Sequence, residues 1–126
     1  MSDVPPMHTI LIVDDTPVNI DLLVTILKDD YNVRVATSGR TTLKIVAKSI
    51  PDLILLDVAM PEMDGYEVCR RLKSDPSTAK IPIIFVTGNE PDKTKEEMFG
   101  AVGTIRKPVN IVTLESMISG CLQSRD

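Results

Sequence analysis

Three short, unbroken runs of apolar residues restrict this chain to a small set of folds. The runs cover residues 9–13, 53–56 and 83–86. Each is too short for an ordinary helix and lacks the alternation of a half-exposed strand, so each predicts a strand buried on both faces. Asp14, Asp57 and Thr87 follow the three runs directly. The runs therefore predict the central strands of a parallel sheet, each ending at a polar residue.

The segments between these runs carry helical periodicity. Apolar residues recur at helical spacing at Ile20, Leu23, Ile26 and Leu27; at Leu43, Val46, Ala47 and Ile50; at Val68, Cys69 and Leu72; and at Ile111, Leu114, Ile118 and Cys121. The stretch from Gly88 to Phe99 is polar and weakly periodic, so we expect a shortened or irregular fourth helix there. Val33 and Val35 predict a half-exposed strand, and Thr104 to Arg106 a short one.

Five strands alternating with five helices indicate a doubly wound α/β fold with helices on both faces of a parallel sheet. The three most apolar runs belong at the centre, and the strand around Val33 and Val35 at an edge. Right-handed crossovers then favour the flavodoxin-like strand order 2-1-3-4-5. In that order the ligand crevice lies beyond the carboxyl ends of strands 1 and 3.

Four polar side chains meet at this edge of the predicted sheet: Asp14, Asp15, Asp57 and Thr87. Three neighbouring carboxylates repel one another and raise one another's pKa, so they need a cation. Carboxylate oxygens suit Mg²⁺, or alternatively Mn²⁺, far better than zinc. His8 is the only histidine and precedes the first strand. An Asp pair after a strand is also explained by solvent contact and helix capping, so the pair alone does not decide the function.

Composition excludes several partners. The net charge is −4 and aromatic residues make up 3% of the chain, which argues against direct nucleic-acid binding. The chain has no apolar stretch of about 18 residues and no basic, apolar leader. Cys69 and Cys121 form no CxxC pair and are expected to be buried, reduced thiols. We expect a cytoplasmic protein without a membrane span.

The domain organisation is simple. Residues 1–8 are polar with two prolines and predict a flexible lead-in, residues 9–122 a single domain, and residues 123–126 a short tail.

One motif is more specific than these patterns. The nine residues from Asp57 to Gly65, DVAMPEMDG, resemble the D-x-x-M-P-x-M-D-G signature of response-regulator receiver domains of the CheY-like superfamily. Asp14-Asp15, Thr87 and the Lys107-Pro108 pair match that family in order and spacing. The resemblance extends from about Thr9 to Leu122.

The resemblance implies a role for each pocket residue. Asp57 would be the nucleophile that takes a phosphoryl group from a phosphohistidine. Asp15 and Asp57 would bind Mg²⁺ directly, Asp14 largely through water, and Ala59 through its carbonyl oxygen. Lys107 would pair with a phosphate oxygen. The remaining phosphate oxygens would be bound by the Thr87 hydroxyl and the backbone N–H groups of Val58, Ala59 and Gly88.

The family also implies a cis peptide before Pro108, and this sequence departs from the family's pattern in two respects. Receivers usually carry Tyr or Phe three residues before the lysine, and this ring moves inward as the threonine approaches the phosphate. Here that switch position is Thr104. The interval from Thr87 to Lys107 is also shorter than is common, at 107 − 87 = 20 positions. The hypothesis is that phosphorylation chiefly reshapes residues 88–100.

The resemblance therefore implies a phosphoacceptor domain of a two-component system that catalyses its own phosphotransfer and dephosphorylation, not a conventional turnover enzyme. The donor would be a histidine kinase or a histidine phosphotransfer protein, and the downstream partner or attached effector is unknown. Both a stand-alone regulator and a receiver of a larger protein fit, as do a monomer and a phosphorylation-dependent dimer.

The sequence argues against three other functions. A haloacid-dehalogenase-type phosphatase needs a second Asp two residues after the nucleophile, where this chain has Ala59. A flavodoxin-like electron carrier needs a Ser/Thr/Gly-rich loop after the first strand, whereas Asp14 and Asp15 would repel a flavin phosphate. A receiver that no longer accepts phosphate is disfavoured by the complete set of pocket residues.

Overall fold

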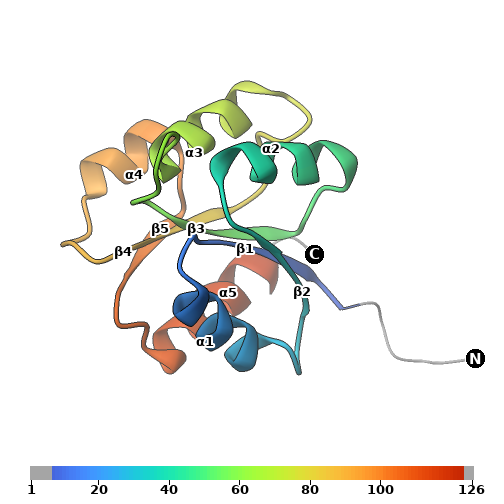
Figure 1. Ribbon diagram of the computed structural model, residues 1–126, viewed down its shortest axis with the longest axis vertical. Helices are drawn as coiled ribbons and strands as arrows, with labels where there is room; N and C mark the ends of the chain where they lie inside the picture. Colours follow the sequence, from blue (N-terminus) through green and yellow to red (C-terminus); the bar gives the residue numbers. More distant parts are fainter. Residues whose placement is uncertain (1–6, 124–126) are drawn as a thin grey trace, which may run out of the picture.

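The computed structural model describes residues 7–123 and contains one five-stranded parallel sheet in the order β2-β1-β3-β4-β5 (Figure 1). The strands are β1 (Thr9–Val13), β2 (Asn32–Ala36), β3 (Leu53–Asp57), β4 (Ile83–Thr87) and β5 (Gly103–Arg106). The predicted strand order is confirmed. Most of the expected lead-in at 1–8 and tail at 123–126 lies outside the described residues.

Five helices connect and follow the strands. They are α1 (Pro17–Leu27), α2 (Gly39–Lys48), α3 (Gly65–Ser74), α4 (Lys93–Phe99) and α5 (Ile111–Gln123). Helices α2, α3 and α4 cover one face of the sheet, and α1 and α5 cover the other (Figure 1). The fourth helix has only 7 residues, as the weak periodicity of this stretch predicted. No helix within residues 7–123 is both long and apolar enough to span a membrane.

The burial of the strands follows their sequence patterns. Every residue of β3 and β4 is buried, and so is β1 after Thr9, because helices cover both faces. The alternating β2 lies at one edge with a mixed burial pattern. Successive residues of a strand point to opposite faces, so each central strand supplies two separate apolar clusters. Leu11, Ile54 and Phe85 face α2, α3 and α4, whereas Ile10, Leu55 and Ile84 face α1 and α5.

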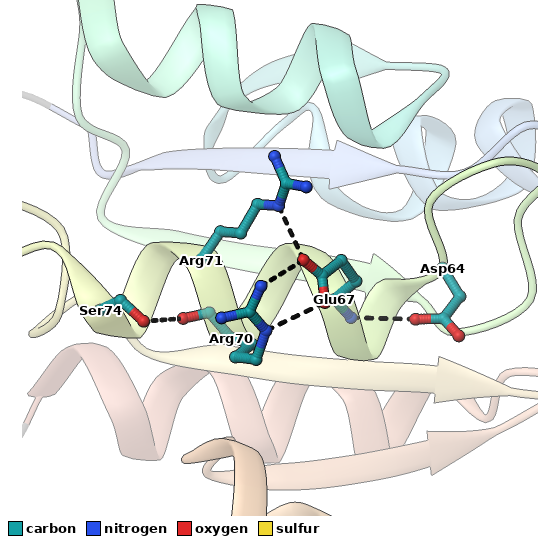
Figure 2. Close-up of polar contacts among 5 residues, drawn as sticks. All are labelled: Asp64, Glu67, Arg70, Arg71 and Ser74. Carbon is teal, nitrogen blue, oxygen red and sulfur yellow. Dashed lines mark hydrogen bonds and ion pairs between the residues drawn. The ribbon is translucent and has the colours of Figure 1, made fainter.

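Helix α3 begins with a side-chain cap beside the site. The Asp64 carboxylate accepts a hydrogen bond from the Glu67 N–H at 2.9 Å, which satisfies a donor of the first turn (Figure 2). Farther along the exposed face, Arg70 and Arg71 both bind Glu67, at 2.5 and 2.8 Å. These bonds lower the pKa of Glu67 to about 2, and the hydrogen bond from Arg70 has the larger effect. Helix α3 is thereby fixed at the end that follows the loop after Asp57.

Two details differ from the expectations. Ile50 lies beyond the end of α2 and is 53% exposed, because the helix stops at Lys48 and the chain turns toward Pro51. Cys69 is buried as expected, but Cys121 is only half-buried, and neither cysteine forms a disulfide.

Candidate functional site

The parallel strands bring the predicted pocket residues to one edge of the sheet. Asp57 and Thr87 are the last residues of β3 and β4, Asp14 follows β1, and Lys107 follows β5. Because all strands run in the same direction, their carboxyl ends lie together at the point where the strand order reverses between β1 and β3.

Three carboxylates converge there. One oxygen from each of Asp14, Asp15 and Asp57 lies within 4.8 Å of the others. Asp14 and Asp57 are 1% and 3% exposed, whereas Asp15 is exposed. Two buried carboxylates and one facing solvent form an oxygen-only cluster that is open on one side.

Lys107 is the cation of this cluster. Its Nζ lies 3.3 Å from Asp57 Oδ1 and 3.4 Å from Asp14 Oδ2. Its backbone N–H donates to the Thr87 carbonyl at 2.7 Å, which ties the end of β5 to the end of β4. The peptide bond between Lys107 and Pro108 is cis. The lysine therefore approaches the carboxylates from the β5 side.

The cluster is electrostatically incomplete. Burial, followed by the charge of Asp14, raises the pKa of Asp57, and Lys107 only partly offsets both effects. Asp14 Oδ2 is buried and accepts no hydrogen bond within the described residues, although Lys107 lies within ion-pair distance. A buried carboxylate oxygen without a hydrogen bond is costly. The donor set therefore fits a hard divalent cation such as Mg²⁺, held by Asp14, Asp15 and Asp57.

The backbone after Asp57 is only partly available for an anion. The Ala59 N–H donates to Asp57 Oδ1 at 3.3 Å and so already points at the acceptor carboxylate. The Val58 N–H instead donates to the Val86 carbonyl at 3.0 Å, so in this structure it is engaged between strands and not directed to the pocket. Gly88 directly follows Thr87, and a Cβ placed there would meet no atom within 4 Å.

Thr87 and Thr104 are the two proposed switch residues and lie on the neighbouring strands β4 and β5. Their hydroxyl groups have different hydrogen-bond partners. The Thr87 hydroxyl accepts a hydrogen bond from the Asn89 N–H at 3.1 Å. Thr104 is paired with Phe85 in the sheet, and its hydroxyl donates to Glu96 of α4 at 2.6 Å.

Two features of this region were not foreseen from the sequence. Glu96 was not singled out as a partner of Thr104, because no local pattern places the short α4 over β5. Gly65 ends the DVAMPEMDG motif, and a Cβ there would lie 2.4 Å from the Asp57 carbonyl oxygen. The glycine in the motif was the available signal, but the atom that it avoids becomes visible only in the folded chain.

Comparisons with known proteins agree with this geometry. The family model described as "Response regulator receiver domain" matches residues 10–119. Protein PilH of Pseudomonas aeruginosa is 35% identical over 119 residues, which covers 92% of this chain and 98% of that protein. A probable cyclic di-GMP phosphodiesterase of Vibrio cholerae is 44% identical over 119 residues, but this chain spans only 27% of its length.

A solved structure shares the fold closely. The receiver domain of a sensor histidine kinase from Pseudomonas aeruginosa has a TM-score of 0.85 at 25% identity, covering 93% of this chain and 98% of that one. That domain was crystallised with a magnesium ion coordinated in its active site cleft. With the family model matching most of its length, the chain belongs to the response regulator receiver domains.

Proposed function

We propose that Asp57 accepts a phosphoryl group from a phosphohistidine of a histidine kinase or a histidine phosphotransfer protein. The observation that carries this proposal is the convergence of Asp57 with two further carboxylates and Lys107 at the carboxyl edge of the sheet. Receiver domains are signalling domains that bind Mg²⁺ at an acidic site, and among the relatives of this chain some stand alone and others form part of larger proteins.

The transfer exchanges one bond to phosphorus for another. An oxygen of the Asp57 carboxylate attacks phosphorus, the P–O bond forms, and the P–N bond to the donor imidazole breaks with its electron pair left on nitrogen. Asp57 Oδ1 already contacts Lys107 Nζ and the Ala59 N–H, both at 3.3 Å. We assign the attack to Oδ2, because Oδ1 is held by these donors.

The surrounding residues lower the electrostatic barrier to joining two anions. Asp14, Asp15, Asp57 and the Ala59 carbonyl are the proposed ligands of Mg²⁺, with Mn²⁺ as the alternative ion. When bound, the metal supplies neutralisation of charge on the transferring group. Lys107 adds a second positive charge beside the Asp57 carboxylate, at Oδ1. The Ala59 N–H and the Thr87 hydroxyl are the proposed hydrogen-bond donors to the phosphoryl oxygens, together with the Gly88 N–H.

The chain is proposed to act as a phosphorylation-controlled regulator and not as a turnover enzyme. The family supports this proposal, because receiver domains are signalling domains. A location in the cytoplasm agrees with Cys69 and Cys121, neither of which forms a disulfide.

Phosphoramidate, a small donor with a P–N bond like that of phosphohistidine, tests the transfer directly. The protein is incubated with phosphoramidate and Mg²⁺, the acyl phosphate is reduced with borohydride, and the modified peptide is mapped by mass spectrometry. Modification at Asp57 is the expected result. Modification at another carboxylate, or at none, would remove the basis of the proposal.

A further inference from the structure

Helix α4 is held on the protein by few apolar contacts. None of its 7 residues is buried, in contrast to α1, α2 and α3, each of which buries at least two. Most helical stability in proteins comes from packing of an apolar face. The position of α4 therefore depends on a small number of identifiable contacts.

The carboxyl end of α4 is the firmly attached end. The Phe99 ring stacks on Tyr66 of α3 with centroids 5.1 Å apart, and Tyr66 in turn contacts Phe85 of β4 edge-on at 5.1 Å. The Cys69 thiol donates to the Phe99 carbonyl at 3.2 Å. Gly100 then ends the helix in a left-handed conformation with φ 82°. These contacts fix Phe99 against the core.

The rest of the segment is attached to α3 by Lys95, whose Nζ lies 4.6 Å from the centroid of the Tyr66 ring, and to β5 by polar contacts. The Thr104 hydroxyl donates to the Glu96 carboxylate at 2.6 Å, in a partly buried position. Nearer the site, Arg106 binds Glu90 at 2.6 Å, but both side chains are largely exposed, so this ion pair contributes little. The bond between Thr104 and Glu96 is the stronger link, because it is made to a charged group in a partly buried position, whereas solvent screens the exposed ion pair.

This link is connected to the proposed phosphorylation site through β4, which pairs with β3 on one side and with β5 on the other. The Thr87 hydroxyl accepts the Asn89 N–H at 3.1 Å, which holds the first turn of the loop that leads to α4. If the hydroxyl turns toward a phosphoryl group on Asp57, the Asn89 N–H loses its acceptor. The loop can then move, and the amino-terminal part of α4 moves with it about the fixed Phe99.

We infer that the hydrogen bond between Thr104 and Glu96 transmits phosphorylation to α4. The bond is formed before phosphorylation and broken after it. The inference rests on the proposed phosphorylation of Asp57. It assigns to a polar contact on β5 the task that an aromatic ring at this position performs elsewhere in the family. Thr104 acts through Glu96 and is a positioning residue, not a catalytic one.

Amide hydrogen exchange across α4 tests the inference in four proteins: the wild type, Thr104→Val, Thr104→Ser and Thr25→Val. Valine keeps the shape of threonine but removes the hydroxyl, serine keeps the hydroxyl, and Thr25 is an exposed residue of α1 that serves as the matched control. Each protein is measured with and without acetyl phosphate and Mg²⁺, and intact mass records how much protein carries phosphate.

Without phosphate, Thr104→Val should exchange its α4 amides about three- to tenfold faster than the wild type, since a charged hydrogen bond is lost. Thr104→Ser and Thr25→Val should match the wild type. In the phosphorylated proteins the difference between Thr104→Val and the wild type should vanish, because the bond is already open.

Two results would overturn the inference. Equal protection in Thr104→Val and the wild type without phosphate means that the bond does not hold α4. If Thr104→Val exchanges its α4 amides faster than the wild type by the same factor with and without phosphate, the bond is not broken by phosphorylation. If intact mass shows no phosphate on the wild type, the proposed function itself has failed, and the inference fails with it. The mass measurement distinguishes this failure from the other two.

Discussion

Lys107 Nζ lies 3.3 Å from Asp57 Oδ1, although the two residues are 50 positions apart in the chain. The same ammonium group lies 3.4 Å from Asp14 Oδ2. One lysine, itself partly exposed, thus faces two buried carboxylates. The site is short of positive charge, which is the condition expected of a pocket that gains a divalent cation and then a phosphoryl group.

Replacing Lys107 should destabilise the metal-free protein. Lys107→Met leaves two buried carboxylates without their cation, and we expect a loss of about 1–2 kcal/mol in the free energy of unfolding, less than for a fully buried pair because the lysine is partly exposed. Urea unfolding measures the loss. Lys44→Met, at an exposed position of α2, is the matched control and should change stability by less than about 0.5 kcal/mol. Equal effects of the two substitutions would contradict the role of Lys107.

Removing the charge of Asp57 should stabilise the metal-free protein at neutral pH. Burial, and then the charge of Asp14, raises the pKa of Asp57 in the folded state above its ordinary value of 3.8. Asp57→Asn relieves the cost of a buried charge, so its thermal midpoint in EDTA should exceed that of the wild type. Added Mg²⁺ should raise the midpoint of the wild type more than that of Asp57→Asn. A larger Mg²⁺ effect on the variant would contradict the assignment of Asp57 to the metal site.

The same raised pKa predicts a pH dependence. Between the ordinary value of 3.8 and the higher folded value, the folded protein keeps a proton on Asp57 that the unfolded chain has released. Unfolding then releases a proton, so the contribution of Asp57 to stability falls as the pH rises through this window and stays low above it. Urea midpoints in EDTA at several pH values should show this fall in the wild type and a smaller fall in Asp57→Asn. Parallel profiles would mean that Asp57 is not the titrating group.

Gly65 should tolerate no side chain. A Cβ there would lie 2.4 Å from the Asp57 carbonyl oxygen and 2.9 Å from the Val58 Cα, both backbone atoms that cannot move without shifting the acceptor. We expect Gly65→Ala to lower the free energy of unfolding by about 2–3 kcal/mol and to slow phosphorylation. Gly120→Ala in α5 is the control, because a Cβ there meets no atom within 4 Å. It should stabilise the protein by up to about 1 kcal/mol. Denaturant unfolding of both variants checks the opposite signs.

The central strands could be predicted because short runs of neighbouring residues determine them. An unbroken apolar run such as Leu53 to Leu56 needs cover on both faces, and only a central strand provides it. The error at Ile50 has the opposite origin: its helical spacing continued past Lys48, but the turn before Pro51 ended the helix. Periodicity describes a helix face and does not show where the chain leaves it.

The carboxylates of the site were predictable from the strand ends, but the contacts of α4 were not. Asp14 and Asp57 follow apolar runs, so the topology alone brings them together. The contact between Thr104 and Glu96 depends on how a short polar helix lies on an edge strand, which no period in the sequence records. The engagement of the Val58 N–H by Val86 likewise follows from the pairing of β3 with β4.

Asp57 is the proposed phosphoacceptor in a metal-dependent pocket. Intact mass after incubation with acetyl phosphate, with Mg²⁺ or with EDTA, tests it most directly in the wild type and Asp57→Asn. Asp52→Asn, five residues earlier in the chain and before β3, is the matched control. We predict a single added phosphate in the wild type and in Asp52→Asn with Mg²⁺, and none in Asp57→Asn or in EDTA. An unmodified wild type, or equal modification of Asp57→Asn, would contradict the claim.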